Sequence, residues 1–284
     1  MYWLPVLGAL SLAGTTIGAK QILKNKKLNI ELYLVASFFA VVLIMLPFFW
    51  FFWKFESPAL LPQNIFIFIM IVFFSIIANL FAHYALKGAK INQIEPAKVM
   101  EPLFVILLAV IFSFIFGEGL YERNFKIIIP AIIAGMALIF SHVENHHLKF
   151  SKYFVAAIMG SFFYALELVL AKLILDFYSP VSFYFLRCLG ILFLGFFFFR
   201  PKFSKINTKT KFGIFGLGGG WVVYRLILYY GYLSLGIVST TLVIMLGPIF
   251  VYLFAHWFLK EKMNWKNIVA SVVIILCVLY GILI

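Results

Sequence analysis

The sequence predicts an all-α, polytopic membrane protein with ten transmembrane helices in two inverted five-helix repeats. Three observations point to this fold: the composition, ten long apolar runs, and a repeat within the chain. Of the 284 residues, 65% are hydrophobic and 12% are charged, whereas a soluble domain carries roughly 25% charged residues. A water-soluble protein of this size cannot bury so much apolar surface, so the outer face is expected to contact lipid.

The ten apolar runs have the lengths that membrane spans need. A helix requires about 17–25 mainly apolar residues to cross a hydrocarbon layer of roughly 30 Å, and inside lipid a helix satisfies its own backbone hydrogen bonds. The connections are too short to form a domain outside the membrane. The predicted spans are residues 3–23, 31–53, 64–86, 93–116, 126–142, 152–175, 181–199, 211–234, 237–259 and 265–284.

Two stretches of the chain recur in the same order. Lys20 lies near the end of the first run and Lys172 near the end of the sixth, each twelve residues after a glycine. Pro102 in the fourth run corresponds to Pro248 in the ninth, and a similar apolar segment follows each proline. The two offsets, 152 and 146 residues, are similar. We therefore divide the chain into two repeats, residues 1–142 and 150–284, with a short linker at 143–149.

An odd number of spans in each repeat means that the two halves enter the membrane in opposite orientations. This plan is typical of secondary carriers, whose substrate site lies near the midplane where the halves meet. Ionisable residues inside the spans should mark such a site, because each costs roughly 2.5–3.5 kcal/mol at the bilayer centre. They are Glu95, Lys98, Glu101, Glu167, Arg187 and Arg225.

The fourth run carries a charged triad. Lys98 is three residues from both Glu95 and Glu101, so a helix makes the three side chains neighbours. The triad has one net negative charge, and Arg225 in the eighth run is its expected partner. The segment either binds or gates a substrate, or forms a static ion pair between helices, or places Glu95 at the membrane interface.

Three prolines are candidates for helix gating. Pro96 and Pro102 donate no backbone hydrogen bond and loosen the helix near the triad. Pro248 holds the matching position in the second half.

Further candidates for substrate binding or coupling lie in the third, sixth and eighth runs. A carboxylate buried mid-membrane can exchange a proton near neutral pH, so Glu167 either couples transport to protons or forms a structural pair with Arg187 or Arg225. Asn79 and His83 share a helix face and either line a cavity or form an interhelical hydrogen bond. Trp221 and Tyr224 follow a glycine-rich stretch that favours close packing, and they are candidates for a cavity wall.

Several of these positions belong to short sequence motifs. They are Ala85-Leu86, Glu101-Pro102 and Glu118 in the first half, and Gly231-Tyr232, Pro248, Glu261 and Phe185-Leu186-Arg187 in the second. With these motifs, nearly the whole chain resembles the drug/metabolite transporter superfamily in its ten-helix, EamA-type branch. The resemblance implies transport of a small metabolite, such as an amino-acid-like solute, commonly its export, by alternating access.

The chain departs from the family pattern in three places. Gly247 replaces the glutamate in the second half, the first half lacks the arginine, and Glu118 lies further from its proline than Glu261 does. The two halves are therefore not expected to work alike. The small multidrug-resistance branch of the superfamily uses a glutamate in the first helix of its repeat for proton coupling, and Glu167 stands in the first helix of the second half.

Two other function classes remain as alternatives. A membrane-embedded enzyme acting on a lipid needs clustered acids for a metal, or a His–acid pair, and Asp176 is the only aspartate. A channel or structural subunit is the other alternative, but such a protein does not need a charged centre between two inverted halves. We expect no cofactor and no nucleic-acid partner. We also expect no metal site, because the His- and Glu-containing residues 142–147 should form a solvated linker. The expected partners are a small-molecule solute and the lipid bilayer.

The distribution of basic residues predicts the orientation in the cytoplasmic membrane. Fifteen Lys and Arg residues follow odd-numbered runs, against three that follow even-numbered runs. Because cytoplasmic loops carry the excess of basic residues, both termini are expected outside the cytoplasm. Terminal tags should react with a membrane-impermeant reagent on intact cells, and labelling only after permeabilisation would contradict this orientation.

Overall fold

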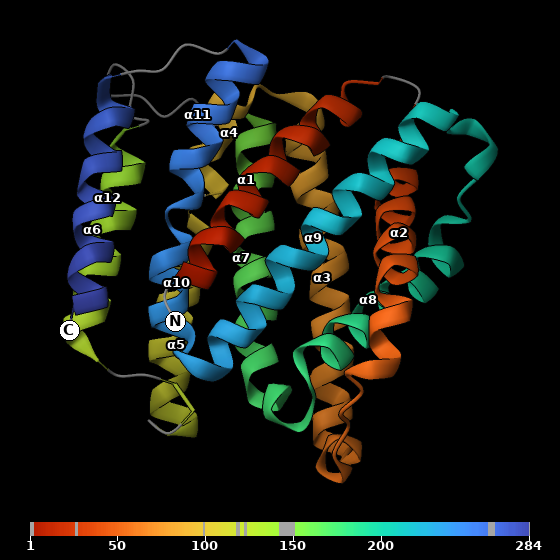
Figure 1. The fold of residues 1–284 in the computed structure, drawn as a ribbon, viewed down its shortest axis with the longest axis horizontal. Coiled ribbons are helices and arrows are strands. Elements are labelled where there is room, and N and C mark those ends of the chain that lie inside the picture. Colours follow the sequence, from red (N-terminus) through yellow and green to blue (C-terminus); the bar gives the residue numbers. More distant parts are fainter. Residues whose placement is uncertain are drawn as a thin grey trace.

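The described part of the chain is helical almost throughout (Figure 1). The computed structural model describes residues 3–25, 28–98, 100–117, 120–121, 124–141, 151–260 and 265–283. Its helices are α1 Trp3–Leu23, α2 Ile30–Phe51, α3 Pro62–Gly88, α4 Ile91–Lys98, α5 Met100–Phe116, α6 Phe125–Ser141, α7 Lys152–Ile174, α8 Pro180–Phe199, α9 Thr208–Ser234, α10 Ile237–Ile244, α11 Gly247–Leu259 and α12 Trp265–Leu283. Three short 3₁₀ turns, at Ser57–Leu60, Leu175–Phe177 and Phe203–Lys205, lie between them.

The predicted spans are confirmed, and the chain is a multi-pass membrane protein. Each of the ten runs coincides with one of these helices, or with two in succession, to within three residues at either end. Among the described residues, seven helices are long and apolar enough to cross a membrane, and three shorter apolar helices accompany them. Large apolar side chains such as Trp50 and Phe51, each 82% exposed, cover the outer face. The linker at 143–149, Glu118 and Glu261 lie outside the described residues.

The ninth run is not one continuous helix. It ends as α10 at Ile244, turns through Met245 and Leu246, and resumes as α11 at Gly247. Pro248 explains the interruption, because it cannot donate to the carbonyl of Ile244 four residues earlier and fits best in the first turn of a new helix. The fourth run comprises α4 and α5, which flank residue 99, a position outside the described residues.

The packing of the helices is reciprocal between the two halves. Helix α1 packs against α9 and α11, and its counterpart α7 packs against α3 and α5. The second helices, α2 and α8, pack against each other, as do the last helices, α6 and α12, at one edge of the bundle (Figure 1). Exchanging the halves leaves this list of partners unchanged, which is the pattern expected of a pseudo-two-fold axis.

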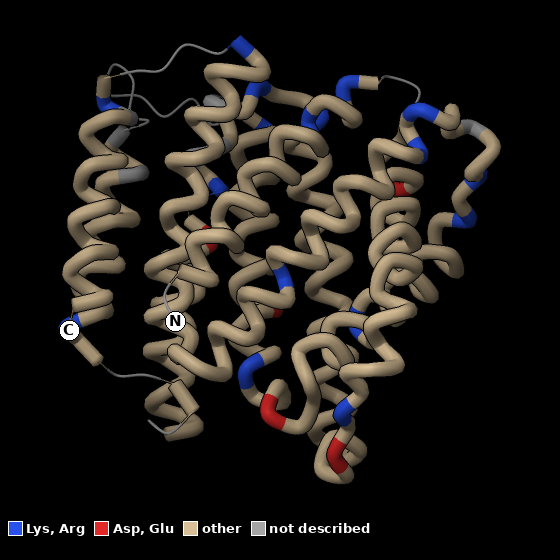
Figure 2. The backbone as a smooth tube through the Cα atoms, viewed as in Figure 1, with Lys and Arg blue, Asp and Glu red and all other residues tan. Residues whose placement is uncertain are grey.

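The two ends of the bundle differ in charge. Figure 2 shows most Lys and Arg residues at the upper end, away from both labelled termini. Lys20 of α1 donates hydrogen bonds to the Leu86 and Ala89 carbonyls at the C-terminus of α3, where a cation is favoured by the helix dipole. Lys172 instead lies 3.8 Å from the carboxylate of Asp176, just beyond the end of α7.

The glycine-rich start of α9 allows one close helix contact. The hydroxyl of Ser11 in α1 donates to the Gly220 carbonyl at 2.8 Å. A Cβ on Gly220 would lie 2.5 Å from the methyl group of Thr15. Because the Thr15 hydroxyl is held by the Ser11 and Leu12 carbonyls, that methyl group cannot turn away freely.

Gly220→Ala should therefore lower the stability of the folded protein by about 1–3 kcal/mol, the usual cost of overpacking. Its neighbour is a matched control, since a Cβ on Gly219 meets nothing within 4 Å. Thermal unfolding in detergent should give a lower midpoint for Gly220→Ala and an unchanged or higher one for Gly219→Ala. Equal midpoints for the two variants would contradict the proposed contact.

Candidate functional site

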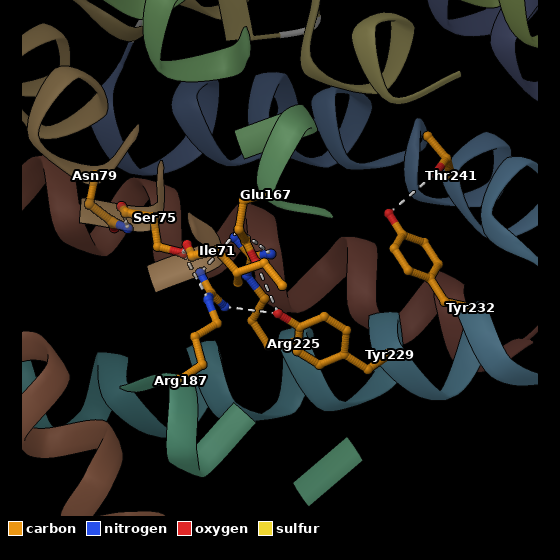
Figure 3. A network of polar contacts seen from close by, with 9 residues as sticks. All are labelled: Ile71, Ser75, Asn79, Glu167, Arg187, Arg225, Tyr229, Tyr232 and Thr241. Carbon is orange, nitrogen blue, oxygen red and sulfur yellow. Dashed lines mark hydrogen bonds and ion pairs between the residues drawn. The ribbon is translucent and has the colours of Figure 1, made fainter. Parts of the chain in front are cut away.

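A network of polar side chains from four helices occupies the interior of the bundle (Figure 3). At its centre is Glu167 of α7, which is fully buried. One of its carboxylate oxygens, Oε2, lies 3.1 Å from Nη2 of Arg187 in α8 and 3.5 Å from Nη1 of Arg225 in α9. The other oxygen accepts a hydrogen bond from the Tyr229 hydroxyl at 3.2 Å. Both oxygens therefore have partners despite complete burial.

Arg187 is held on three sides. Its Nη2 donates to Glu167 at 3.1 Å, its Nη1 to the Tyr229 hydroxyl at 2.9 Å, and its Nε to the Ser75 hydroxyl of α3 at 2.9 Å. Ser75 in turn donates to the Ile71 carbonyl. Such a buried guanidinium is stable only when its donors are satisfied, and these bonds tie α3, a helix of the first half, to the second half.

Arg225 is held more loosely. Its guanidinium lies over the rings of Tyr164, at 5.4 Å, and Tyr224, at 5.6 Å, within the range of a cation–π interaction. Its Nη1 is buried, and its 3.5 Å contact with Glu167 makes an ion pair but no hydrogen bond. This donor is therefore available to another acceptor.

A small cavity adjoins the network. Its volume is about 30 Å³, close to the share of one water molecule in the liquid. Phe38 and Val41 form an apolar wall, and His83 of α3 presents a buried Nδ1 that has no hydrogen-bond partner. The full lining is Ser37, Phe38, Val41, Asn79, His83, Tyr164, Tyr184, Arg187, Trp221 and Arg225.

The structure brings together six of the residues singled out from the sequence, Arg187 among them. Asn79, His83, Trp221 and Arg225 line the cavity, and Glu167 bridges the arginines beside it. The hydrogen bond of Asn79 is made within α3, to the Ser75 carbonyl at 2.7 Å, and not to another helix.

Tyr224 is not part of the lining; its ring packs edge-on against Trp221 at 6.0 Å.

Lys98 and Glu101 of the charged triad are not part of the cavity lining. The Lys98 ammonium is 3.5 Å from the Thr16 hydroxyl of α1. Glu101 is half-buried, and its electrostatic field reaches Arg225. The ion pair that the structure gives Arg225 is with Glu167, however, so the pairing of Arg225 with the triad stays a prediction.

Two of the gating candidates lie in this segment. Pro102 sits half-buried in the first turn of α5. The side chains of Glu95 and Pro96 lie outside the description.

Sequence reasoning singled out Tyr224 but not the three other tyrosines of the site. Tyr164 precedes Glu167 by three residues, Tyr184 precedes Arg187 by three, and Tyr229 follows Arg225 by four. Helical spacing places each tyrosine on the face of a buried charge. A search for hydroxyl groups within one turn of each ionisable residue would have found them.

Comparison with known proteins identifies the second half of the chain. Residues 151–283 match the model of the EamA-like transporter family. The EamA-like segment holds Glu167, Arg187, Arg225 and Tyr229, whereas Ser75, Asn79 and His83 come from the half before it. The family consists of membrane transporters, which supports a transporter role for this chain and fits the expectation that it is not an enzyme.

A second comparison covers the whole chain and concerns its fold. A solved structure titled "Crystal structure of protein" is similar with a TM-score of 0.68, over 98% of this chain and 95% of that one, at 13% sequence identity. At this identity the likeness concerns the fold alone. No curated protein matches the chain.

The bonding pattern predicts that Arg187 is the structural arginine of the EamA-like site. Arg187→Gln removes one of the two positive charges that pair with the buried Glu167 carboxylate. This substitution should lower the free energy of unfolding by about 3–5 kcal/mol. The control is Arg200→Gln, which removes an exposed arginine beyond the end of α8. Thermal unfolding should show a large loss only for Arg187→Gln, and a loss no larger than that of the control would contradict this role.

Proposed function

We propose that the chain is a secondary carrier that moves a small polar or amphipathic solute, in the export direction, by alternating access. The observation that carries the proposal is the buried network of Glu167, Arg187 and Arg225 beside a polar-lined cavity. Well-packed apolar residues in place of a buried ion pair are often as stable or more so. Charges retained inside a membrane bundle therefore favour a functional explanation.

The arrangement of the helices supports alternating access. The site draws α3 from the first half and α7, α8 and α9 from the second, so relative movement of the halves would change its exposure. The reciprocal packing fits the proposed repeats at residues 1–142 and 150–284. The interruption before Pro248 gives the second half a point at which the chain can bend.

Proton coupling is part of the proposal. Protonation of Glu167 would remove the negative charge that, among the described residues, contacts both arginines, and would weaken both contacts, of which the one to Arg225 is the longer. The distribution of charge in Figure 2 favours a basic end that faces the cytoplasm and termini that face outward.

The test is transport by proteoliposomes that contain the purified protein. Wild-type protein should accumulate one or more members of a defined mixture of small metabolites, read by mass spectrometry, when a proton gradient is imposed. Glu101→Gln and Arg225→Gln should reduce this accumulation to the level of empty liposomes. The matched control is Glu31→Gln, which changes an exposed carboxylate at the start of α2.

All variants are first checked for insertion and folding by gel filtration and thermal unfolding. Unchanged transport by both the Glu101 and Arg225 variants would refute the proposed site. Accumulation that ignores the proton gradient would refute coupling alone.

A further inference from the structure

The cavity carries an excess of positive charge. The charged side chains in its lining are Arg187 and Arg225, and Glu167 is the single carboxylate that contacts both. The charges of these three side chains therefore sum to one net positive charge, and the negative field of Glu101, which is not part of the lining, also reaches Arg225. In surroundings of low dielectric constant, such a charge strongly favours an added negative group.

The excess charge is concentrated on Arg225. The donors of Arg187 are engaged by Glu167, Tyr229 and Ser75. Arg225 instead presents a buried Nη1 without a hydrogen bond. Buried hydrogen-bond donors are almost always paired in folded proteins. We therefore expect the unpaired Nη1 of Arg225 to donate to an acceptor atom of a ligand.

A second buried polar atom without a hydrogen-bond partner belongs to a residue that lines the same cavity. The side chain of His83 is 6% exposed, and its Nδ1 has no hydrogen-bond partner. Its ring is fixed by an edge-on contact with Tyr33, with ring centroids 4.8 Å apart. A ligand with an acceptor atom for Arg225 and a second polar atom for His83 can therefore be bound by groups from α3 and α9 together.

We propose that the transported solute carries a carboxylate, which binds Arg225, and an apolar body, which packs on Phe38, Val41 and Trp221. This inference rests on the proposed carrier function and names its substrate class. The closed cavity, at about 30 Å³, accommodates a group of about the size of a carboxylate, and the apolar body enters when the halves separate.

Binding of the carboxylate changes the pairing in the site. The solute takes Arg225 from Glu167, and Glu167 keeps its shorter contact with Arg187 and its bond to Tyr229. Each guanidinium then faces one carboxylate, and the net charge of the cluster is zero. A neutral or cationic solute of the same shape leaves the positive charge of Arg225 without this compensation.

Calorimetric titration of the purified full-length protein tests the charge preference with three probes of similar shape: phenylacetate, phenylacetamide and 2-phenylethylammonium. Phenylacetate should bind at least tenfold more tightly than the amide, and the ammonium ion more weakly than both. Arg225→Gln should abolish the preference for phenylacetate over the amide. Arg225→Lys should weaken phenylacetate but keep it the best of the three. Arg200→Gln should bind as the wild type does.

If Arg225→Gln does not fold, the relative affinities of the wild-type protein for the three probes decide the proposal. Equal binding of phenylacetate and phenylacetamide, tighter binding of the ammonium ion, or no binding of any probe would overturn it. The outcomes separate the two proposals. Selective binding without transport would refute the carrier and leave the carboxylate site standing, whereas transport of neutral or cationic solutes alone would refute the site and leave the carrier standing.

Discussion

The carboxylate of Glu167 links the helices at the centre of this bundle. It joins α7 to α8 through Arg187 and to α9 through Arg225, and the Arg187–Ser75 bond extends the connection to α3. Because an unpaired charge in a low-dielectric interior is very costly, these helices must keep the rotations and depths at which the side chains meet. The position of the cavity follows from the same constraint.

The two arginines have different tasks within that constraint. Each guanidinium nitrogen of Arg187 has a hydrogen-bond partner, and this arginine fixes the geometry, whereas Arg225 lies over two aromatic rings and has an unused donor. A transport site needs both kinds of group, since something must hold the bundle while something else exchanges partners with a ligand. The protein therefore combines a rigid ion pair, Glu167–Arg187, with an adaptable one, Glu167–Arg225, and the two pairs share one carboxylate.

The sequence alone predicted the spans well and the pairings only in part. Lipid imposes helix length and hydrophobicity on every span, so the runs could be located to within three residues. Which charges meet depends on how each helix is rotated against its neighbours, and a run that is apolar on all sides says little about rotation.

For that reason the sequence offered Arg225 two partners, the triad around Lys98 and Glu167. The ion pair in the structure is with Glu167, and the pairing with the triad stays a prediction. The turn at Met245 and Leu246 was not predicted, although Pro248 signalled it.

Alternating access of the buried cavity is the central claim, and the accessibility of Ser37 from each side of the membrane tests it most directly. Ser37 lines the cavity, and a Ser37→Cys variant can be made after Cys188 and Cys277 are replaced by alanine. In oriented vesicles, membrane-impermeant thiol reagents should label this cysteine from either side, and substrate should change the ratio of the two rates. Labelling from one side only, or from neither, would contradict the account.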